Sequence, residues 1–307
     1  MIVTKAIIPA AGWGTRFLPA TKSIPKEMLP LLDKPAIQYI IEEGVKSGIK
    51  QFIIVTSKNK NSLEDHFDIL PELENVLKSK NRIKLLGNLP KLIEAAQFMY
   101  VRQRKALGLG HAVLTARSAF KKEYVSIFLP DDIITGMNPG MAQLIKVASQ
   151  EKCSVVAVQE VPFDKVSRYG VIAVKKQFSP NLFQVRELVE KPAEKDAPSN
   201  LAIVGRYVLS PDIFDSIEDI SNGSTGEIQL TDGIQNLLLS GEKVFAYKIQ
   251  GTRYDIGNPI GWLKANISLA LKHSEYSNDI TKFLTELDRD LLTIQGKAEF
   301  LSKQSSL

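Results

Sequence analysis

The sequence of 307 residues is poor in the residues that indicate a disulfide-rich or membrane-spanning protein. Its only cysteine is Cys153, so an intramolecular disulfide and a cysteine-based zinc site are both excluded. Because the apolar run 154–158 follows, we expect Cys153 to be a small buried core residue. No apolar run is long enough to cross a bilayer, and no secretory leader is recognisable at the start. These absences favour a soluble, cytoplasmic protein.

Long blocks of like charge are also missing. The net charge is +5, and basic and acidic residues alternate through most of the chain. This pattern is not that of a nucleic-acid-binding surface, so we expect neither a nucleic-acid polymer nor a membrane as a partner. The mild positive excess fits either a solvated surface or a cleft that accepts anionic substrates, and composition alone does not distinguish the two.

The first half of the chain alternates strand and helix patterns. Buried strands are expected at 6–11, 51–56, 98–103, 125–129 and 154–158, and helices at 35–48, 110–120 and 138–150. This alternation favours parallel strands joined by right-handed crossovers. We therefore predict an α/β fold with a Rossmann-like, mostly parallel central sheet and helices on both of its faces.

The pattern changes in the second half. Two short apolar runs, 169–174 and 183–189, predict an inserted β-ribbon. Further strands are expected at 201–209 and 244–249, and helices at 211–219, 228–240 and 259–273. A C-terminal tail follows, with an apolar stripe at helical spacing that consists of Ile280, Phe283, Leu284, Leu287, Leu291 and Ile294.

The most informative segment follows the first strand. It reads Ala10-Ala11-Gly12-Trp13-Gly14-Thr15-Arg16-Phe17-Leu18-Pro19, and Pro25-Lys26-Glu27-Met28-Leu29-Pro30 comes soon after. Glycines allow a tight turn whose free N–H groups can face phosphate oxygens. The spacing matches neither the dinucleotide fingerprint nor the P-loop. The glycines alone would fit an ordinary strand-to-helix turn, but the added cations Arg16, Lys22 and Lys26 favour polyphosphate binding.

Two aspartates are candidate metal ligands. Asp131 follows the strand 125–129, and ligands of open α/β sheets bind at the carboxyl ends of strands. A carboxylate there suits Mg²⁺, which prefers oxygen ligands and shares them with phosphates. Asp132 is the alternative at this position. Asp255 lies in another loop, where a helix cap would explain it equally well.

The segments 10–19 and 25–30 resemble those of sugar nucleotidyltransferases, in particular bacterial UTP–glucose-1-phosphate uridylyltransferases, also called UDP-glucose pyrophosphorylases. Similar motifs follow in order up to about residue 273, whereas 61–96 and the tail carry none. They are Leu107-Gly108-Leu109-Gly110-His111-Ala112, Leu129-Pro130-Asp131-Asp132, Arg168-Tyr169-Gly170, Val189-Glu190-Lys191-Pro192, Gly205-Arg206-Tyr207, Gly226-Glu227-Ile228-Gln229-Leu230-Thr231-Asp232 and Tyr254-Asp255-Ile256-Gly257.

The resemblance implies a Mg²⁺-dependent enzyme that converts UTP and glucose 1-phosphate to UDP-glucose and pyrophosphate by direct in-line attack. The implied catalytic residues are Arg16, Lys26, Asp131, Lys191 and Asp255, with Asp131 and Asp255 holding the metal. The implied substrate-binding residues are Ala11, Gly12, Gly14, Thr15, Gln103, Gly108, Gly110, Gly170, Glu190 and Gly205.

The resemblance also assigns individual roles. Gln103 would read the uracil edge, Glu190 would bind sugar hydroxyls and Lys191 the sugar phosphate, although an exposed ion pair would explain the last two. Gly170 and Gly205 would let a hexose ring lie close to bare backbone. His111 is expected to be structural.

The implied chemistry needs few side chains. A phosphate monoester has its second pKa near ~6 and is already an anion at neutral pH, so no general base is required. The difficulty lies in bringing two anions together, which calls for metal ions, cations and positioning. The sequence offers no nucleophilic cysteine and no evident histidine-based triad, and this agrees with such a reaction.

Several alternatives remain open. The same chemistry could use another pair, such as dTTP, and a regulatory paralogue could bind nucleotide without turnover. An NAD(P)-dependent oxidoreductase is weakened by the missing dinucleotide fingerprint. We expect a catalytic domain, 1–273, and a helical tail, 274–307, that forms a subunit contact in a homodimer or homotetramer, with folding back onto its own domain as the alternative. The sequence gives no account of Trp13, where the family often has a smaller aliphatic residue.

Overall fold

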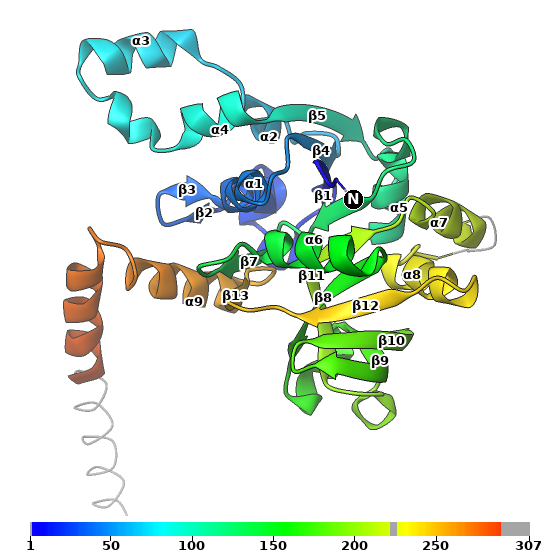
Figure 1. Cartoon of the computed structure of the whole chain (residues 1–307). Helices are drawn as coiled ribbons and strands as arrows, with labels where there is room; N and C mark the ends of the chain where they lie inside the picture. Colours follow the sequence, from blue (N-terminus) through cyan, green and yellow to red (C-terminus); the bar gives the residue numbers. More distant parts are fainter. Residues whose placement is uncertain (1, 222–225, 290–307) are drawn as a thin grey trace, which may run out of the picture.

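The computed structural model describes residues 2–221 and 226–289. At its centre lies a nine-stranded sheet (Figure 1). The strands are β1 (Lys5–Pro9), β4 (Gln51–Thr56), β5 (Gln97–Arg102), β6 (Val125–Phe128), β8 (Ser154–Glu160), β9 (Gly170–Ser179), β10 (Leu182–Glu190), β11 (Leu201–Leu209) and β12 (Val244–Lys248). Their spatial order is β5-β4-β1-β6-β11-β8-β12-β10-β9. Each of the strands predicted from the sequence is therefore present in one sheet.

The sheet is mixed, which corrects the expectation of a mostly parallel one. Strands β5, β4, β1 and β6 pair in parallel, and β12 pairs in parallel with β8. Between these groups β11 runs antiparallel to both β6 and β8, and the ribbon of β9 and β10 adds further antiparallel pairs. Because β11 follows this ribbon and not a crossover helix, the rule that makes βαβ strands parallel does not apply to it.

Helices cover both faces of the sheet. One face carries α1 (Ala36–Lys46), α6 (Gly140–Glu151) and α9 (Pro259–Ala270), and the other carries α5 (Leu109–Thr115), α7 (Ile213–Ser221) and α8 (Leu230–Leu239). Neighbouring strand residues point to opposite faces. Thus Ile8 joins the core under α1 and α6, whereas Ile7 joins the core under α5 and α8. Cys153 is buried as expected, and burial raises the pKa of its thiol to about 12.

Short elements complete the fold. The pair of β7 (Asp132–Thr135) and β13 (Thr252–Asp255) was not predicted, and its register sets Asp132 opposite Asp255. The other elements are β2 (Pro30–Leu31), β3 (Lys34–Pro35), α2 (Ser62–Asp65), α3 (Pro71–Ser79) and α4 (Leu89–Ala95). Of these, α3 lies at the top of Figure 1, apart from the large sheet, and α4 leads back from it to β5.

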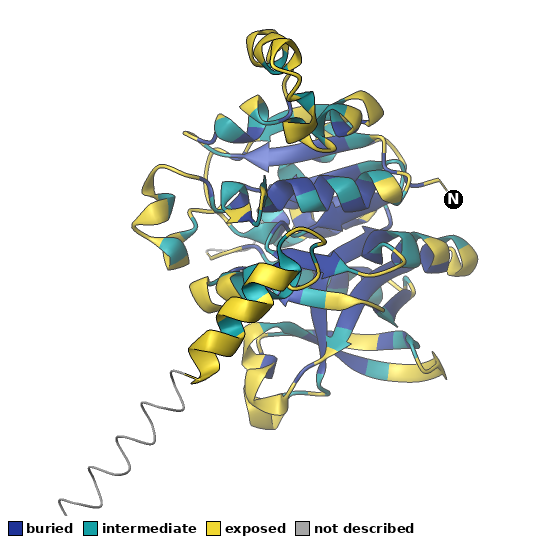
Figure 2. Cartoon of the chain, turned by 90° about the vertical axis from the view of Figure 1, so that its left-hand side faces the viewer, coloured by how far each residue is buried: buried dark blue, intermediate teal, exposed yellow. Residues whose placement is uncertain are grey.

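The described part of the tail is a helix over residues 277–289 that projects from the body (Figure 2). Within the described part of the apolar stripe, Phe283 and Leu287 are 56% and 42% exposed, whereas Ile280 and Leu284 are half-buried. Leu291 and Ile294 lie outside the described residues. Across residues 2–221 and 226–289, no helix has the length and apolarity that a bilayer crossing needs.

Candidate active site

Two adjoining cavities lie where β1, β5 and β6 end. The first has a volume of about 340 Å³ and is lined by the loop 11–15 together with Lys26, Gln103 and Gly108. The second has a volume of about 180 Å³ and is lined by Arg16, Asp131, Asp132, Gly170, Glu190 and Asp255, among others. Leu109 lines both cavities. Most of the residues singled out in the sequence thus come together at one edge of the sheet.

The glycine loop packs closely against the turn that carries Lys26. Gly14 has a φ of +66°, and a Cβ there would lie 3.2 Å from the Cβ of Lys26. Thr21 fixes this arrangement, because its hydroxyl donates to the carbonyl of Gly14 at 2.8 Å. The loop and the Lys26 side chain therefore share one wall of the first cavity, as expected of a polyphosphate site.

A buried lysine that sequence reasoning missed supports this wall. Lys60 donates to the carbonyl of Ala10 at 2.5 Å and to Glu27 Oε2 at 2.9 Å. Lys60 and Glu27 are 8% and 2% exposed, and burial lowers the pKa of Lys60 although Glu27 opposes the shift. The pair links the start of the glycine loop to the residue beside Lys26. No motif marked Lys60, because a single lysine after a strand has no distinctive pattern.

Asp131 and Asp255 converge beside Gly257. A Cβ on Gly257 would lie 3.3 Å from Asp131 Oδ2, 3.2 Å from Asp255 Oδ1 and 3.5 Å from Arg16 Nη1. The Lys26 ammonium lies 2.7 Å from Asp131 Oδ2. Burial opposes ionisation of Asp131, but Lys26 outweighs it and holds the pKa of this carboxyl below its usual range. Both aspartates thus present carboxylate oxygens to the same small region.

This pair fits Mg²⁺ better than a metal that requires a full protein cage. Within the part of the chain that the structure describes, no group of three or more His, Cys, Asp or Glu side chains could hold a metal ion. Mg²⁺ is typically bound by one or two carboxylates and by substrate phosphates, and it keeps several waters. Two carboxylates beside a phosphate-binding loop meet that requirement.

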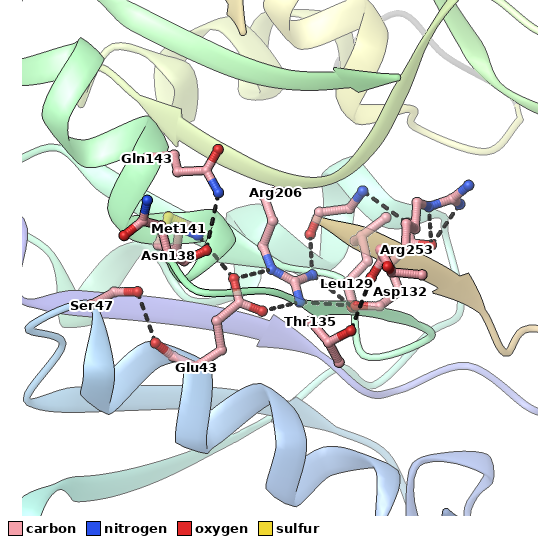
Figure 3. Close-up of polar contacts among 12 residues, drawn as sticks. Glu43, Ser47, Leu129, Asp132, Thr135, Asn138, Met141, Gln143, Arg206 and Arg253 are labelled. Atoms are coloured by element: carbon pink, nitrogen blue, oxygen red, sulfur yellow. Dashed lines mark hydrogen bonds and ion pairs between the residues drawn. The ribbon is translucent and has the colours of Figure 1, made fainter. Parts of the chain in front are cut away.

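Asp132, the alternative ligand, is occupied by other contacts (Figure 3). Arg253 Nε donates to its Oδ1 at 2.6 Å, and the backbone N–H of Gly205 donates to its Oδ2 at 2.8 Å. A Cβ on Gly205 would lie 2.7 Å from Asp132 Oδ2. Gly205, which was expected to line a sugar site, is therefore buried against Asp132 and lines neither cavity.

The far end of the second cavity is formed by the ends of the β-ribbon. Gly170 pairs with Glu190, and Thr231 donates to Glu190 Oε2 at 2.7 Å. A Cβ on Gly170 would lie 3.1 Å from this carboxylate and 3.2 Å from the Thr231 hydroxyl, so glycine keeps the space open. Lys191 is 55% exposed in its side chain and contacts Glu190 Oε1 at 3.2 Å, but it does not line the cavity.

At the opposite end of the site, Gln103 is buried and uses its amide nitrogen within the protein. Its Nε2 lies 3.3 Å from the Gly108 carbonyl and 2.8 Å from His111 Nδ1. Burial lowers the pKa of His111, so its neutral imidazole accepts this bond at neutral pH. Gln103 Oε1 has no hydrogen-bond partner among the described residues, so it can accept a bond from a ligand in the first cavity.

Gly108 and Gly110 are explained by packing. Gly108 has a φ of +97°, and a Cβ there would lie 2.6 Å from the carbonyl oxygen of Ile228. A Cβ on Gly110 would lie 2.9 Å from the same oxygen. Of the two, Gly108 lines the first cavity and Gly110 does not. Their shared role is close contact with the backbone that leads into α8.

Comparisons with known proteins show which family the chain resembles over most of its length. A family model described as nucleotidyl transferase matches residues 5–271. A UTP–glucose-1-phosphate uridylyltransferase of Staphylococcus epidermidis is 49% identical over 286 residues, which cover 93% of this chain and 99% of that protein. A UTP–glucose-1-phosphate uridylyltransferase 2 of Staphylococcus saprophyticus is 48% identical over 285 residues, covering 93% of this chain and 98% of that protein.

Solved structures are similar over nearly the whole chain. A UDP-glucose pyrophosphorylase complexed with UDP-glucose has a TM-score of 0.79 at 41% identity, covering 89% of this chain and 100% of that one. A UTP-bound UGPase from Acinetobacter baumannii has a TM-score of 0.85 at 39% identity, covering 93% of this chain and 100% of that one.

Proposed function

The chain belongs to the nucleotidyl transferase family, among its UTP–glucose-1-phosphate uridylyltransferases, and we propose that it converts UTP and glucose 1-phosphate to UDP-glucose and pyrophosphate at the two adjoining cavities. The observation that carries this proposal is the meeting of Arg16, Asp131 and Asp255 beside Gly257 in the second cavity, where Asp131 also contacts Lys26 of the first cavity. Anionic groups from two substrates can meet there.

The first cavity takes the nucleotide. The N–H groups of the loop 11–15 face the phosphates, and the side chains of Arg16 and Lys26 offset their charge. Gln103 lies at the other end of this cavity, where its free Oε1 can accept from the N3–H of uracil. The Lys60–Glu27 pair keeps the loop and the Lys26 turn together while the phosphates bind.

Asp131 and Asp255 are the residues that would hold Mg²⁺. The bound ion would supply positive charge that offsets the charge of the triphosphate and of the leaving pyrophosphate. Lys26, which pairs with Asp131 at 2.7 Å, would then be free to turn toward a phosphate oxygen. Asp132 stays paired with Arg253 and fixes the loop that carries Asp131.

The second cavity takes the sugar phosphate. Glu190, held by Thr231, accepts from sugar hydroxyls, and Gly170 leaves room for the ring. Lys191 has a long exposed side chain that can turn toward the sugar phosphate. That phosphate attacks the α-phosphorus of UTP in line, and pyrophosphate leaves. Because the nucleophile is already an anion, no side chain has to remove a proton.

The proposal is tested by offering the purified chain glucose 1-phosphate with UTP, dTTP, CTP or ATP in turn, with Mg²⁺ present. We expect UDP-glucose and an equal amount of pyrophosphate with UTP, and much less product with the other nucleotides. A preference for dTTP would support the other substrate pair. Nucleotide binding without any nucleotide-sugar product would support a regulatory paralogue.

Replacing Gln103 by alanine should weaken the preference for UTP over CTP. Cytosine presents an acceptor at N3 where uracil presents a donor, so Oε1 of Gln103 favours uracil. Losing one hydrogen bond of this kind should reduce the ratio of kcat/KM values for UTP and CTP by roughly tenfold. The KM for glucose 1-phosphate serves as the control and should not change. An unaltered UTP preference would remove Gln103 from base recognition.

The same preference should depend on pH in the wild-type chain. The pKa of His111 lies below its usual 6.5, so the imidazole gains its second proton only as the pH falls below that value. The protonated ring can only donate at Nδ1, so it no longer accepts a bond from the Gln103 amide nitrogen. This favours a rotation of the Gln103 amide that turns Oε1 toward His111 and away from uracil. The UTP/CTP ratio should therefore fall in acid. Titration of the triphosphate affects UTP and CTP alike, so it cancels in this ratio. In the Gln103→Ala variant, the UTP/CTP ratio should not fall in acid.

We also propose that the tail forms a subunit contact in a homodimer or homotetramer, because Phe283 and Leu287 are exposed on its helix and such stripes need a partner. Removing residues 278–307 should lower the number of subunits in the oligomer, as measured by sedimentation, while the turnover per chain stays unchanged. Phe283→Ser with Leu287→Ser should act alike, and Lys282→Ser is the matched polar-face control. If the shortened chain has the same number of subunits as the full chain, the tail is not the subunit contact.

A further inference from the structure

Trp13 is an exposed aromatic residue within the glycine loop. It lies between Gly12 and Gly14 and is 78% exposed, yet it lines the first cavity together with Gln103 and Gly108. Within residues 2–221 and 226–289, its indole forms no hydrogen bond and no aromatic or cation–π contact. A single exposed aromatic residue is ordinary on a surface. Its place in the wall of a ligand cavity is what distinguishes Trp13.

The fold does not explain this indole. The other tryptophan of the chain, Trp262, packs against the core under α1 and donates to the Pro30 carbonyl at 3.0 Å. Trp13 has no comparable packing. A Cβ on the neighbouring Gly12 would meet no atom within 4 Å, so there is open space beside the loop. The indole can therefore turn without displacing other groups.

We propose that Trp13 stacks on the uracil ring of the bound nucleotide and covers the first cavity over its base. This inference rests on the proposed function and assigns it a further binding residue. Gln103 offers a hydrogen bond to the edge of the base, but its amide cannot cover the face. Stacking on an aromatic side chain accepts any base, because every base has a π-face. Trp13 therefore provides affinity, whereas Gln103 provides the choice of base.

This division of roles predicts a particular kinetic result. The uridine base is bound alike in the ground state and the transition state, so stacking lowers KM without raising kcat. Trp13→Ala should raise the KM for UTP by about tenfold, with kcat and the KM for glucose 1-phosphate unchanged. Trp13→Phe should retain much of the affinity because phenylalanine still stacks. The melting temperature should not move, since the side chain is exposed.

Fluorescence provides a readout that does not depend on turnover. In the Trp262→Phe variant, Trp13 is the only indole, and titration with UTP or UDP-glucose should quench its emission. Inorganic tripolyphosphate carries the same phosphates without a base and should leave the emission nearly unchanged. The matched control is Trp13→Phe, in which Trp262 should not respond to UTP.

The outcomes separate this inference from the proposed function. A Trp13→Ala enzyme that makes UDP-glucose with the wild-type KM for UTP would overturn the stacking and leave the function intact. Equal quenching by tripolyphosphate would also overturn it, because the indole would then respond to phosphate alone. Quenching by UTP in a chain that makes no nucleotide sugar would support the stacking and contradict the function.

Discussion

Replacing Asp131 by asparagine should lower turnover by ~10²-fold or more, on the order of 3 kcal/mol of transition-state stabilisation. The amide has the size of the carboxylate, but it lacks the charge that would hold Mg²⁺ beside Asp255. The fold should tolerate the change, because the side chain is 31% exposed and the amide oxygen can still accept from Lys26. The measurement is the initial rate as a function of Mg²⁺ concentration.

Asp132→Asn is the matched control for this experiment. Its carboxylate is 8% exposed and pairs with Arg253, so the substitution leaves a buried guanidinium short of its counter-charge. We expect Asp132→Asn to lower the melting temperature, and Asp131→Asn to lower the response to Mg²⁺ at a near-normal melting temperature. Wild-type turnover of Asp131→Asn at saturating Mg²⁺ would exclude Asp131 as a metal ligand.

The sequence predicted the local elements well, because strands buried on both faces and amphipathic helices leave clear apolar patterns. It could not predict the direction of β11. That strand has nine buried residues and would suit a parallel or an antiparallel position equally well. Its direction depends on the ribbon before it and on pairing with β6 and β8, which are long-range contacts.

The candidate site could be predicted to a similar extent. Asp131 could be singled out from its place after a strand, and Gln103 from the family resemblance, and both line the cavities. The supporting contacts were not found. Lys60 meets Ala10 across 50 positions, and Arg206 meets Glu43 across 163, so no local pattern connects them. The packing of Gly205 against Asp132 was not predicted either, because the sequence shows that a Cβ is absent but not which side chain occupies that space.

The pair of Arg206 and Glu43 lies at the centre of the buried polar network in Figure 3. Arg206 is fully buried, with Nη2 at 2.6 Å from Glu43 Oε2 and Nε at 3.0 Å from Oε1. It also donates to the carbonyls of Gly205 and Asp132, both at 2.8 Å. These bonds join α1 and β11 to the loop that carries Asp131. Arg206 is therefore a positioning residue for the loop that carries Asp131.

Arg206→Met should reduce the free energy of unfolding by ~3–5 kcal/mol, because it leaves the Glu43 carboxylate buried without a counter-charge. The double variant Glu43→Gln with Arg206→Met removes that charge too, and its amide can still accept from the Met141 N–H, which lies 2.9 Å from Glu43 Oε1. We therefore expect the double variant to be more stable than Arg206→Met alone. Denaturant unfolding of the wild type, both single variants and the double variant gives the coupling energy. If the double variant is as unstable as Arg206→Met, the loss comes from the carbonyl bonds of Arg206, and the stranded charge is not its cause.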